Sequence, residues 1–209
     1  MSGIPESVRV LSSAPRTAQP AGERRLSTPE RILFAAAARV VAGGTANLSM
    51  QDVADAAGVS KGLIHYHFHD KETLLTRLIE WMTRELVDRE AATLVRSTPK
   101  TAVDDLWMWV AGEIERGHLR VLNELAQERG PLISDAIKLS ARVRREAAAV
   151  TVDRLFAILE LRPRVPVQLL ADVIVAFIDG LAIHAALAPD ANHRVAFDVL
   201  WLSLLSLAE

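Results

Sequence analysis

Apolar residues recur at helical spacing along most of the 209-residue chain, from about residue 27 to the end. The first periodic stretch places Ile32, Leu33, Ala36, Ala37 and Val40 on one face of a helix. No stretch alternates apolar and polar residues over enough positions to demand a strand. The pattern therefore predicts an all-α protein.

Capping residues and helix breakers divide this pattern into separate helices. Thr28 is expected to cap the first helix, because Pro29 follows it at the first helical position, and Gly43 and Gly44 should end that helix. The next three helices should begin after the capping residues Ser49, Ser60 and Asp70, and the third of them should extend to about residue 96. Farther along, the pattern predicts helices over residues 101–129, 132–161 (one or two helices), 166–187 and 193–208.

Composition and period also divide the chain into three parts. Residues 1–26 are rich in Ser, Pro, Arg and Gly and show no period, so we expect a flexible N-terminal arm. Residues 27–72 hold the short helices and form a predicted helix-turn-helix domain. Residues 73–209 hold the longer helices and form a predicted second domain, a helical bundle.

The segment Met50–Lys71, MQDVADAAGVSKGLIHYHFHDK, carries the most informative motif. It contains two short helices joined by a tight turn at Gly58, and glycine suits the left-handed conformation that such a turn requires. Ala54 lies where the two helices would approach most closely. The space between the helices should be filled by Val53, Val59, Ile64 and Phe68. This is the pattern of a helix-turn-helix, whose second helix enters the major groove of DNA.

The segments RILFAAAARVVAGG and LSMQDVADAAGVSKGLIHYHFHDKETLL, about a fifth of the chain, resemble the TetR family of bacterial transcription regulators. The specific parts are Ala-Gly-Val-Ser-Lys-Gly and His-Tyr-His-Phe followed by Lys-Glu. The resemblance implies a DNA-binding N-terminal domain and a helical C-terminal domain for ligand binding and dimerisation. It also implies a homodimer that binds a palindromic operator in double-stranded DNA and is released by a small apolar ligand. Repression is the family's common mode, and activation is the alternative.

The candidate DNA-binding residues are Thr28, Ser49, Ser60, Lys61, Gly62, Leu63, His65, Tyr66 and Lys71. The three hydroxyl residues are included because hydroxyls and free N–H groups at helix N-termini can face phosphate. Lys61 carries a positive charge in the first turn of the second helix, where the positive end of the helix dipole repels it. An anionic partner would offset that repulsion. Gly62 would let the helix backbone approach DNA closely, and Leu63 could pack on a thymine methyl group.

The family resemblance adds roles for three of these residues. It implies that His65 and Tyr66 contact bases or phosphates and that Lys71 clamps a phosphate. Family members often carry Thr at the position of Leu63 and Tyr at the position of His65, so the base sequence that is read stays open. A metal site at His65, His67 and His69 is not expected, because only the first and third share a helix face and such a site needs three or four ligands.

The helices over residues 166–187 and 193–208 are apolar on nearly every side. Each therefore needs two burial surfaces, of which one is the core of its own chain and the other is a second copy of the chain. The resemblance agrees, because family members dimerise through their last two long helices. The candidate dimer-interface residues are Phe177, Leu181, Phe197, Leu200, Trp201 and Leu204.

A regulator also needs an effector site, and such pockets are mostly apolar with a few polar groups. The candidate ligand-binding residues are Trp107, His118, Phe156, Phe177 and His184, with Met108, Trp109 and Asn123 as further candidates. The alternative is that the aromatic side chains only fill the core while the polar ones face solvent. No cofactor is expected.

The net charge of −2, from 24 basic and 26 acidic residues, argues at first against a nucleic-acid partner. Counted by segment, however, residues 1–26 carry +2, residues 27–71 carry no net charge and the remainder carries −4. The acidic excess therefore belongs to the body of the protein. Lys61 and Lys71 lie on the expected contact face, and the arm adds arginines at positions 9, 16, 24 and 25.

Several other classes of protein are disfavoured. The chain has no Cys, and it shows no phosphate loop, nucleophile elbow or HExxH motif, so an enzyme is not expected. A helix-turn-helix that serves only protein interaction is a second alternative, but it would not need Lys61, Gly62, Tyr66 and Lys71. The N-terminus lacks the pattern of a secretory signal. The apolar run over residues 169–188 contains two Asp and one His, so we expect a buried helix, no membrane partner and a cytoplasmic protein.

Overall fold

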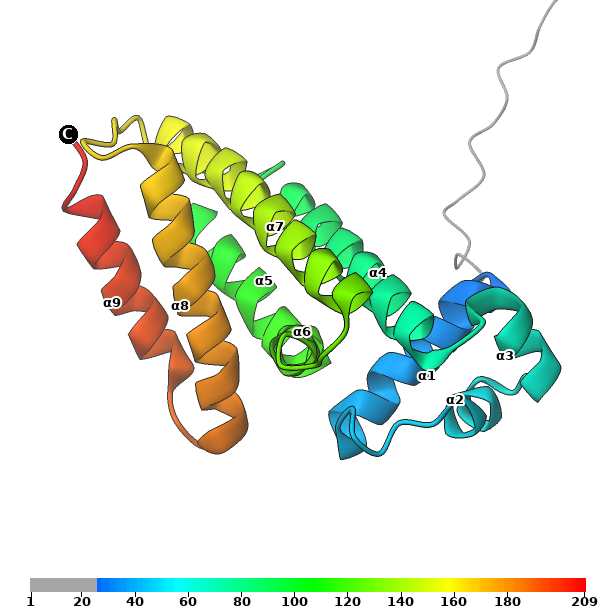
Figure 1. Ribbon diagram of the computed structural model, residues 1–209. Coiled ribbons are helices and arrows are strands. Elements are labelled where there is room, and N and C mark those ends of the chain that lie inside the picture. Colours follow the sequence, from blue (N-terminus) through cyan, green and yellow to red (C-terminus); the bar gives the residue numbers. More distant parts are fainter. Residues whose placement is uncertain (1–25) are drawn as a thin grey trace, which may run out of the picture.

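The computed structural model describes residues 26–209, and these residues form nine helices (Figure 1). The helices are α1 (Thr28–Gly43), α2 (Met50–Ala57), α3 (Lys61–Phe68), α4 (Lys71–Thr93), α5 (Ala102–Arg116), α6 (His118–Leu125), α7 (Pro131–Ile158), α8 (Val167–Leu187) and α9 (His193–Leu205). The β-structure of the described residues is one isolated antiparallel bridge between Pro163 and Ala208. The all-α prediction is confirmed. The predicted N-terminal arm lies outside the described residues, apart from Leu26.

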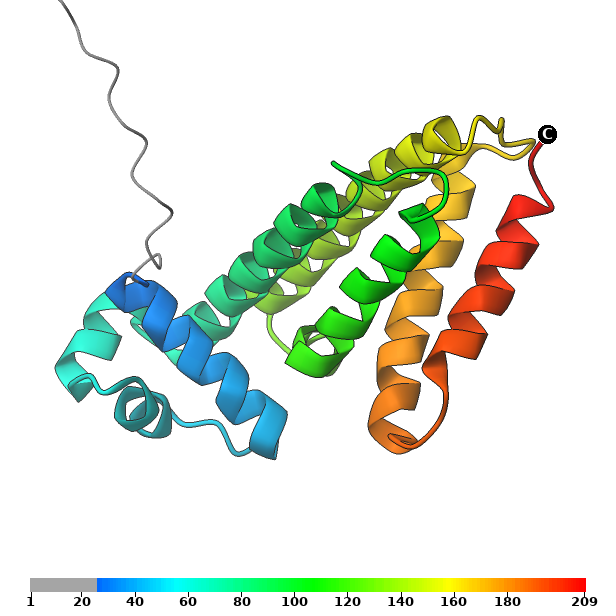
Figure 2. The same cartoon turned by 180° about the vertical axis from the view of Figure 1, so that it is seen from behind.

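Helix α4 joins two groups of helices (Figures 1 and 2). Helices α1, α2 and α3 gather around its N-terminal end, α5 and α7 lie beside the rest of it, and α8 and α9 lie beyond these two helices. With 23 residues, α4 is about 35 Å long. Its residues from Leu74 to Met82 belong to the core around α1–α3, whereas Leu86 belongs to the core of the second group. A shift of α4 therefore acts on both cores.

The core around α1–α3 extends beyond these helices. Val121, Leu122 and Leu125 of α6 lie in it, as do Ile133 and Ala136 of α7. The α1–α3 unit consequently packs on the rest of the chain through buried apolar contacts. A domain boundary between residues 72 and 73 stays a prediction.

The capping residues agree with the sequence pattern in three of four cases. The side chains of Ser49, Ser60 and Asp70 accept the backbone N–H bonds that cap α2, α3 and α4, as predicted. The prediction of Thr28 as a cap is wrong. Ser27 caps α1, because Ser27 Oγ accepts the Glu30 N–H at 3.4 Å while Glu30 Oε2 accepts the Ser27 N–H at 2.8 Å. This is a capping box one residue earlier in the chain.

The predicted single helix over residues 101–129 is also wrong. Gly117 adopts a φ of 72°, which ends α5 and begins α6. Glycine reaches this left-handed conformation at little cost, so it permits the change of direction. Helix α6 ends at Leu125. Helices α4 and α9 also end a few residues before their predicted limits.

Candidate nucleic-acid interface

The turn between α2 and α3 has the geometry that the sequence predicts. Gly58 adopts φ 64° and ψ 41°, and the Val59 N–H donates to the Ala54 carbonyl at 3.0 Å. Ala54 is fully buried between the helices. Arg31 of α1 adds a contact that the sequence did not suggest, because its Nη2 donates to the Ala57 carbonyl at 2.7 Å. The turn is therefore fixed both internally and from α1.

Helix α3 presents one buried and one exposed face. Ile64 and Phe68 are buried in the core and anchor the helix. On the other face, the exposed residues include Lys61, Gly62, Leu63, His65 and Tyr66. Tyr66 is 75% exposed, and its ring meets the edge of the His67 ring with centroids 5.1 Å apart. Five of the nine candidate DNA-binding residues therefore share the outward side of one anchored helix.

The hydroxyl candidates lie at the starts of three different helices. Ser60 is exposed, and its Oγ accepts the Leu63 N–H at 3.2 Å. Ser49 is exposed as well, and its Oγ accepts the Asp52 N–H at 3.1 Å. Thr28 is half-buried in the first turn of α1. Capping and a contact to phosphate can coexist at Ser49 and Ser60, because a hydroxyl both donates and accepts hydrogen bonds.

Lys71 has a structural partner that the sequence did not suggest. Its Nζ donates to the Thr45 carbonyl at 2.8 Å, and its side chain is half-buried. This contact ties the start of α4 to the loop between α1 and α2. An ammonium group has three N–H donors, so the contact leaves two for another partner.

The three histidines near the end of α3 do not converge on a common point. His65 Nδ1 lies 2.9 Å from the His69 carbonyl oxygen, whereas His67 is half-buried beside Tyr66 and Phe68. Within residues 26–209, no group of three or more His, Cys, Asp or Glu side chains is arranged to hold a metal ion. The backbone N–H of Thr73 lowers the pKa of the neighbouring Asp70 carboxyl, which is the cap of α4.

Charged residues of α6 and of the segment just after it hold the α1–α2 loop and the end of α1, and sequence reasoning missed all of them. Glu124 Oε1 accepts the Thr45 N–H at 2.6 Å, and Glu128 accepts the Thr45 hydroxyl. Arg120 donates to the Val41 carbonyl near the end of α1. Thr45 is 4% exposed, so these bonds are shielded from water. They connect the body directly to the helix-turn-helix.

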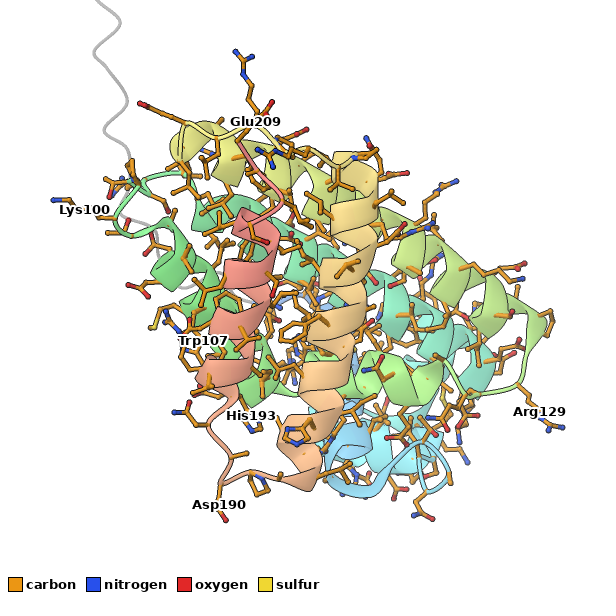
Figure 3. The ribbon with its side chains drawn as sticks, turned by 90° about the vertical axis from the view of Figure 1, so that its left-hand side faces the viewer. Lys100, Trp107, Arg129, Asp190, His193 and Glu209 are labelled. Carbon is orange, nitrogen blue, oxygen red and sulfur yellow. The ribbon has the colours of Figure 1, made fainter. Side chains whose placement is uncertain are left out.

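Two of the predicted ligand-binding residues belong to polar or ionic contacts. His118 lies in a buried network, where Arg89 binds both carboxyl oxygens of Glu113 at 2.6 and 2.9 Å and places its Nη2 3.3 Å from His118 Nδ1. Burial and the charge of Arg89 lower the pKa of His118. Trp107 is half-buried on α5 beside α9, with the Arg194 guanidinium 5.7 Å from its ring centroid (Figure 3).

The other three occupy different surroundings. Phe156 is buried in the second core, Phe177 is half-buried against it, and His184 is exposed with its ring 5.4 Å from that of His193. An enclosed apolar cavity of the body lies between α4, α5, α7, α8 and α9. Its lining contains Trp109, one of the further candidates, and none of the five principal candidates.

The predicted dimer-interface residues also need revision. Leu181, Phe197, Trp201 and Leu204 are at most 5% exposed, because they fill the core of their own chain. Phe177 and Leu200 are half-buried. Two other stripes remain uncovered, namely Leu169, Val173, Ala176, Gly180, Ile183 and Leu187 on α8 and Val195, Val199 and Leu202 on α9. Their spacing of three and four residues places each stripe on one helix face.

Helix α8 is also long and apolar enough to cross a membrane, with a mean hydropathy of 1.9. In its most apolar stretch, 33% of the residues are buried within the chain. A single helix of this kind is weak evidence for a membrane span, because the core helix of a soluble protein passes the same test. About two thirds of this stretch is therefore not buried within the chain.

Residues 32–78 match the family model described as bacterial regulatory proteins, tetR family. The HTH-type transcriptional regulator CymR of Pseudomonas putida is 33% identical over 81 residues, which cover 39% of this chain and 40% of that regulator. The matched segment therefore spans well under two thirds of the length of this curated relative.

Solved structures resemble the chain over a much larger part. A TetR transcriptional regulator from Legionella pneumophila superimposes with a TM-score of 0.69 and 20% identity, covering 87% of this chain and all of that one. A complex of SmeT with triclosan gives a TM-score of 0.64 and 18% identity, covering 88% and 92% of the two chains. At these identities the likeness establishes the fold. The chain thus has the fold of these regulators, and its residues 32–78 are similar to the tetR family of bacterial regulatory proteins.

Proposed function

We propose that this protein is a ligand-responsive transcriptional repressor that binds a palindromic operator as a homodimer. The observation that carries the proposal is the outward face of α3, where Lys61, Gly62, Leu63, His65 and Tyr66 are exposed on a helix that is anchored from behind. A second helix of this kind is the element that enters the major groove in helix-turn-helix proteins. TetR-family proteins are DNA-binding transcriptional regulators and not enzymes. Because such regulators act on DNA inside the cell, the resemblance also favours a cytoplasmic protein.

The uncovered stripes of α8 and α9 support a homodimer. Their apolar side chains would be buried against the same stripes of a second copy, as two-fold symmetry requires. Ala176 and Gly180 lie in the middle of the α8 stripe, and a side chain added at Gly180 would meet no atom of its own chain within 4 Å. Small residues there permit a close approach of two α8 helices. The two α3 helices would then read half-sites about 34–36 Å apart.

Ligand response is supported by the position of α4 between the two cores. Glu90 of α4 lines the enclosed cavity of the body, and Leu74 to Met82 of the same helix lie in the core behind the helix-turn-helix. A molecule that displaces α4 at the cavity would therefore move α3. A typical coupling of about 1–3 kcal/mol would change operator affinity roughly 5–150-fold. SmeT, a protein of the same fold, has been solved with triclosan, a small ligand.

Two alternatives predict different behaviour. A helix-turn-helix used only for protein interaction would show no saturable affinity for its own upstream DNA. An activator would bind the operator, but it would raise transcription rather than lower it. A reporter gene behind the bound DNA distinguishes an activator from a repressor.

A gel-shift assay with the purified protein and its upstream DNA tests the proposal. We expect one saturable band, whose footprint has two symmetric halves. Substitution Tyr66→Ala should abolish the band, whereas Met108→Ala, which also truncates an exposed side chain but on α5, should leave it unchanged. Absence of any specific band below physiological salt would contradict operator binding, and equal loss in both variants would contradict the role of α3.

A further inference from the structure

The enclosed cavity of the body is almost entirely apolar. Its lining comes from five helices and consists of Glu90, Leu106, Trp109, Val110, Ala148, Thr151, Val152, Ile174, Ile178, Phe197, Leu200 and Trp201. The cavity measures about 20 Å³, which is room for one water molecule. Apolar walls exclude strongly hydrated molecules, so the few polar atoms of the lining decide what the cavity can recognise.

Two residues of the lining carry hydrogen-bond donors that have no acceptor. Trp109 Nε1 on α5 and Trp201 Nε1 on α9 are both shielded from solvent, and neither has a hydrogen-bond partner among the described residues. Trp201 is 5% exposed. A buried N–H group almost always has an acceptor, because an unpaired donor is costly. The described residues therefore supply no oxygen or nitrogen acceptor to either indole N–H group.

A charged ligand of either sign is disfavoured in this apolar cavity. Glu90 is 5% exposed, and burial raises the pKa of its carboxyl to about 7 although it bonds to Thr151. An anion would be repelled by the ionised form of this carboxyl. The positive charge of Arg144 also acts on Glu90, and Asp179 holds the Arg144 guanidinium in place at 2.5 and 3.2 Å. A cation would lose its hydration among the apolar walls, and Glu90 offers it a compensating charge only when its carboxyl is ionised.

We propose that this cavity binds an uncharged, mainly apolar molecule carrying one or two acceptor oxygens, which receive the indole N–H groups of Trp109 and Trp201. The inference rests on the proposed ligand response, and it specifies the chemical class of the ligand. A ketone, ester or ether on an aromatic or aliphatic body has this chemistry. A hydrocarbon of the same shape would fill the same space but leave both donors unpaired.

A molecule larger than one water molecule enters only if a helix moves, and α9 is held to α5 partly by exposed contacts. Arg194 of α9 closes the seam to α5, with Nη2 2.7 Å from Asp104 and its guanidinium over the rings of Trp107 and Phe197. In Figure 3, Trp107 lies on α5 directly beside α9. Exposed ion pairs contribute little to stability, so the Arg194 contact adds little to the cost of opening the seam. Phe197 lines the cavity behind it.

Three probes with the same heavy-atom skeleton test the proposal. Acetophenone carries an acceptor oxygen, α-methylstyrene has a carbon in its place, and 1-phenylethylamine carries a cationic nitrogen. Binding to the purified full-length protein is measured by titration calorimetry and by the rise in Tm, in the absence of DNA. We expect acetophenone to bind about tenfold more tightly than α-methylstyrene, because one acceptor satisfies a buried donor. The amine should bind more weakly than the ketone.

Substitutions of the two tryptophans test whether their indole groups cause the preference for the ketone over the alkene. In Trp201→Phe and, separately, in Trp109→Phe, the ratio of ketone to alkene affinity should fall towards one, whereas Trp107→Phe, outside the cavity, should preserve it. A ratio within each variant cancels changes in cavity volume, and two variants guard against one that fails to fold. The proposal is overturned if the ketone binds no tighter than the alkene, if the amine binds tightest, or if no probe binds. Because DNA is absent, none of these outcomes depends on operator binding.

Discussion

Glu124 of α6 accepts a hydrogen bond from the backbone N–H of Thr45 at 2.6 Å, and so joins the body of the protein to the loop between α1 and α2. Thr45 is buried, and its other polar groups are taken by Glu128 and Lys71. The orientation of the helix-turn-helix is therefore fixed by polar contacts as well as by the apolar packing of α6. Because α6 and α4 both contact the α1–α3 unit, a change in the body reaches α3 by two routes.

Replacing Glu124 by Ala should destabilise the protein by about 1–3 kcal/mol, because the buried Thr45 N–H loses its acceptor. Urea unfolding at fixed protein concentration measures the change. Glu115→Ala is the matched control, since Glu115 is exposed on α5, and it should stay within about 0.5 kcal/mol of the wild type. Equal stabilities for the two variants would show that the α6 contact contributes nothing.

The adjacent glycines Gly43 and Gly44 should respond oppositely to substitution by Ala. Gly44 has φ 74° and ψ 170°, a conformation that side chains rarely adopt, and a Cβ there would lie 2.8 Å from Glu124 Oε1. Gly44→Ala should cost about 1–3 kcal/mol. A Cβ at Gly43 meets no atom within 4 Å, so Gly43→Ala should be neutral or slightly stabilising. Thermal or urea unfolding of both variants tests the contrast.

Local signals in the sequence predicted much of the helix-turn-helix. The caps Ser49, Ser60 and Asp70 and the left-handed Gly58 were predictable because each depends on residues within about four positions. The break at Gly117 was missed, since an isolated glycine inside an apolar periodic run is usually tolerated in a helix. The contacts of Glu124 and Arg120 join positions 79 residues apart, and no local pattern indicates them.

The body shows a second limit of sequence patterns. Helices α8 and α9 are apolar on several sides, so periodicity cannot tell which side faces the core of the same chain. The side of α9 that contains Trp201 and Leu204 proved to be the inner one, while Val199 and Leu202 remain uncovered. Similarly, the cavity could not be located from residue types, because its lining combines five helices and depends on tertiary packing.

Gly62 provides a test that separates DNA binding from stability. A Cβ at this position would have ample space, with Ser60 Oγ as its nearest neighbour at 4.0 Å. Gly62→Ala should therefore stabilise the free protein by about 0.5–1 kcal/mol through helix propensity. If the α3 backbone closely approaches DNA, the same variant should bind the operator several-fold more weakly. A gel shift and a urea titration on one preparation give both quantities, and tighter operator binding would rule out the close approach.

Glu90 should make stability depend on pH. Its pKa is raised from 4.5 to about 7 by burial, the dominant cause, with Glu113 also raising it and Arg144 and Thr151 lowering it. The folded protein then binds more protons than the unfolded chain between these pH values. The free energy of unfolding therefore falls as pH rises from about 4.5 through 7. Glu90→Gln should be more stable than the wild type by up to about 3 kcal/mol at pH 8. Near pH 4.5 the advantage should vanish, and a difference that does not vary with pH would contradict a buried, titrating Glu90.

The proposed dimer can be disrupted without disturbing the monomer. Leu202 is 69% exposed on the uncovered α9 stripe, so Leu202→Glu introduces a charge that water solvates in the single chain but that a partner surface would bury. We expect sedimentation to show a shift from dimer to monomer, with helical content unchanged. Operator affinity should fall steeply, because one half-site supplies only part of the contacts. Met108→Glu is the control, since Met108 is 70% exposed on α5, away from both stripes, and it should remain dimeric. If both variants stay dimeric and bind the operator like the wild type, the α9 stripe is not the interface, and the uncovered face of α8 would have to form it alone.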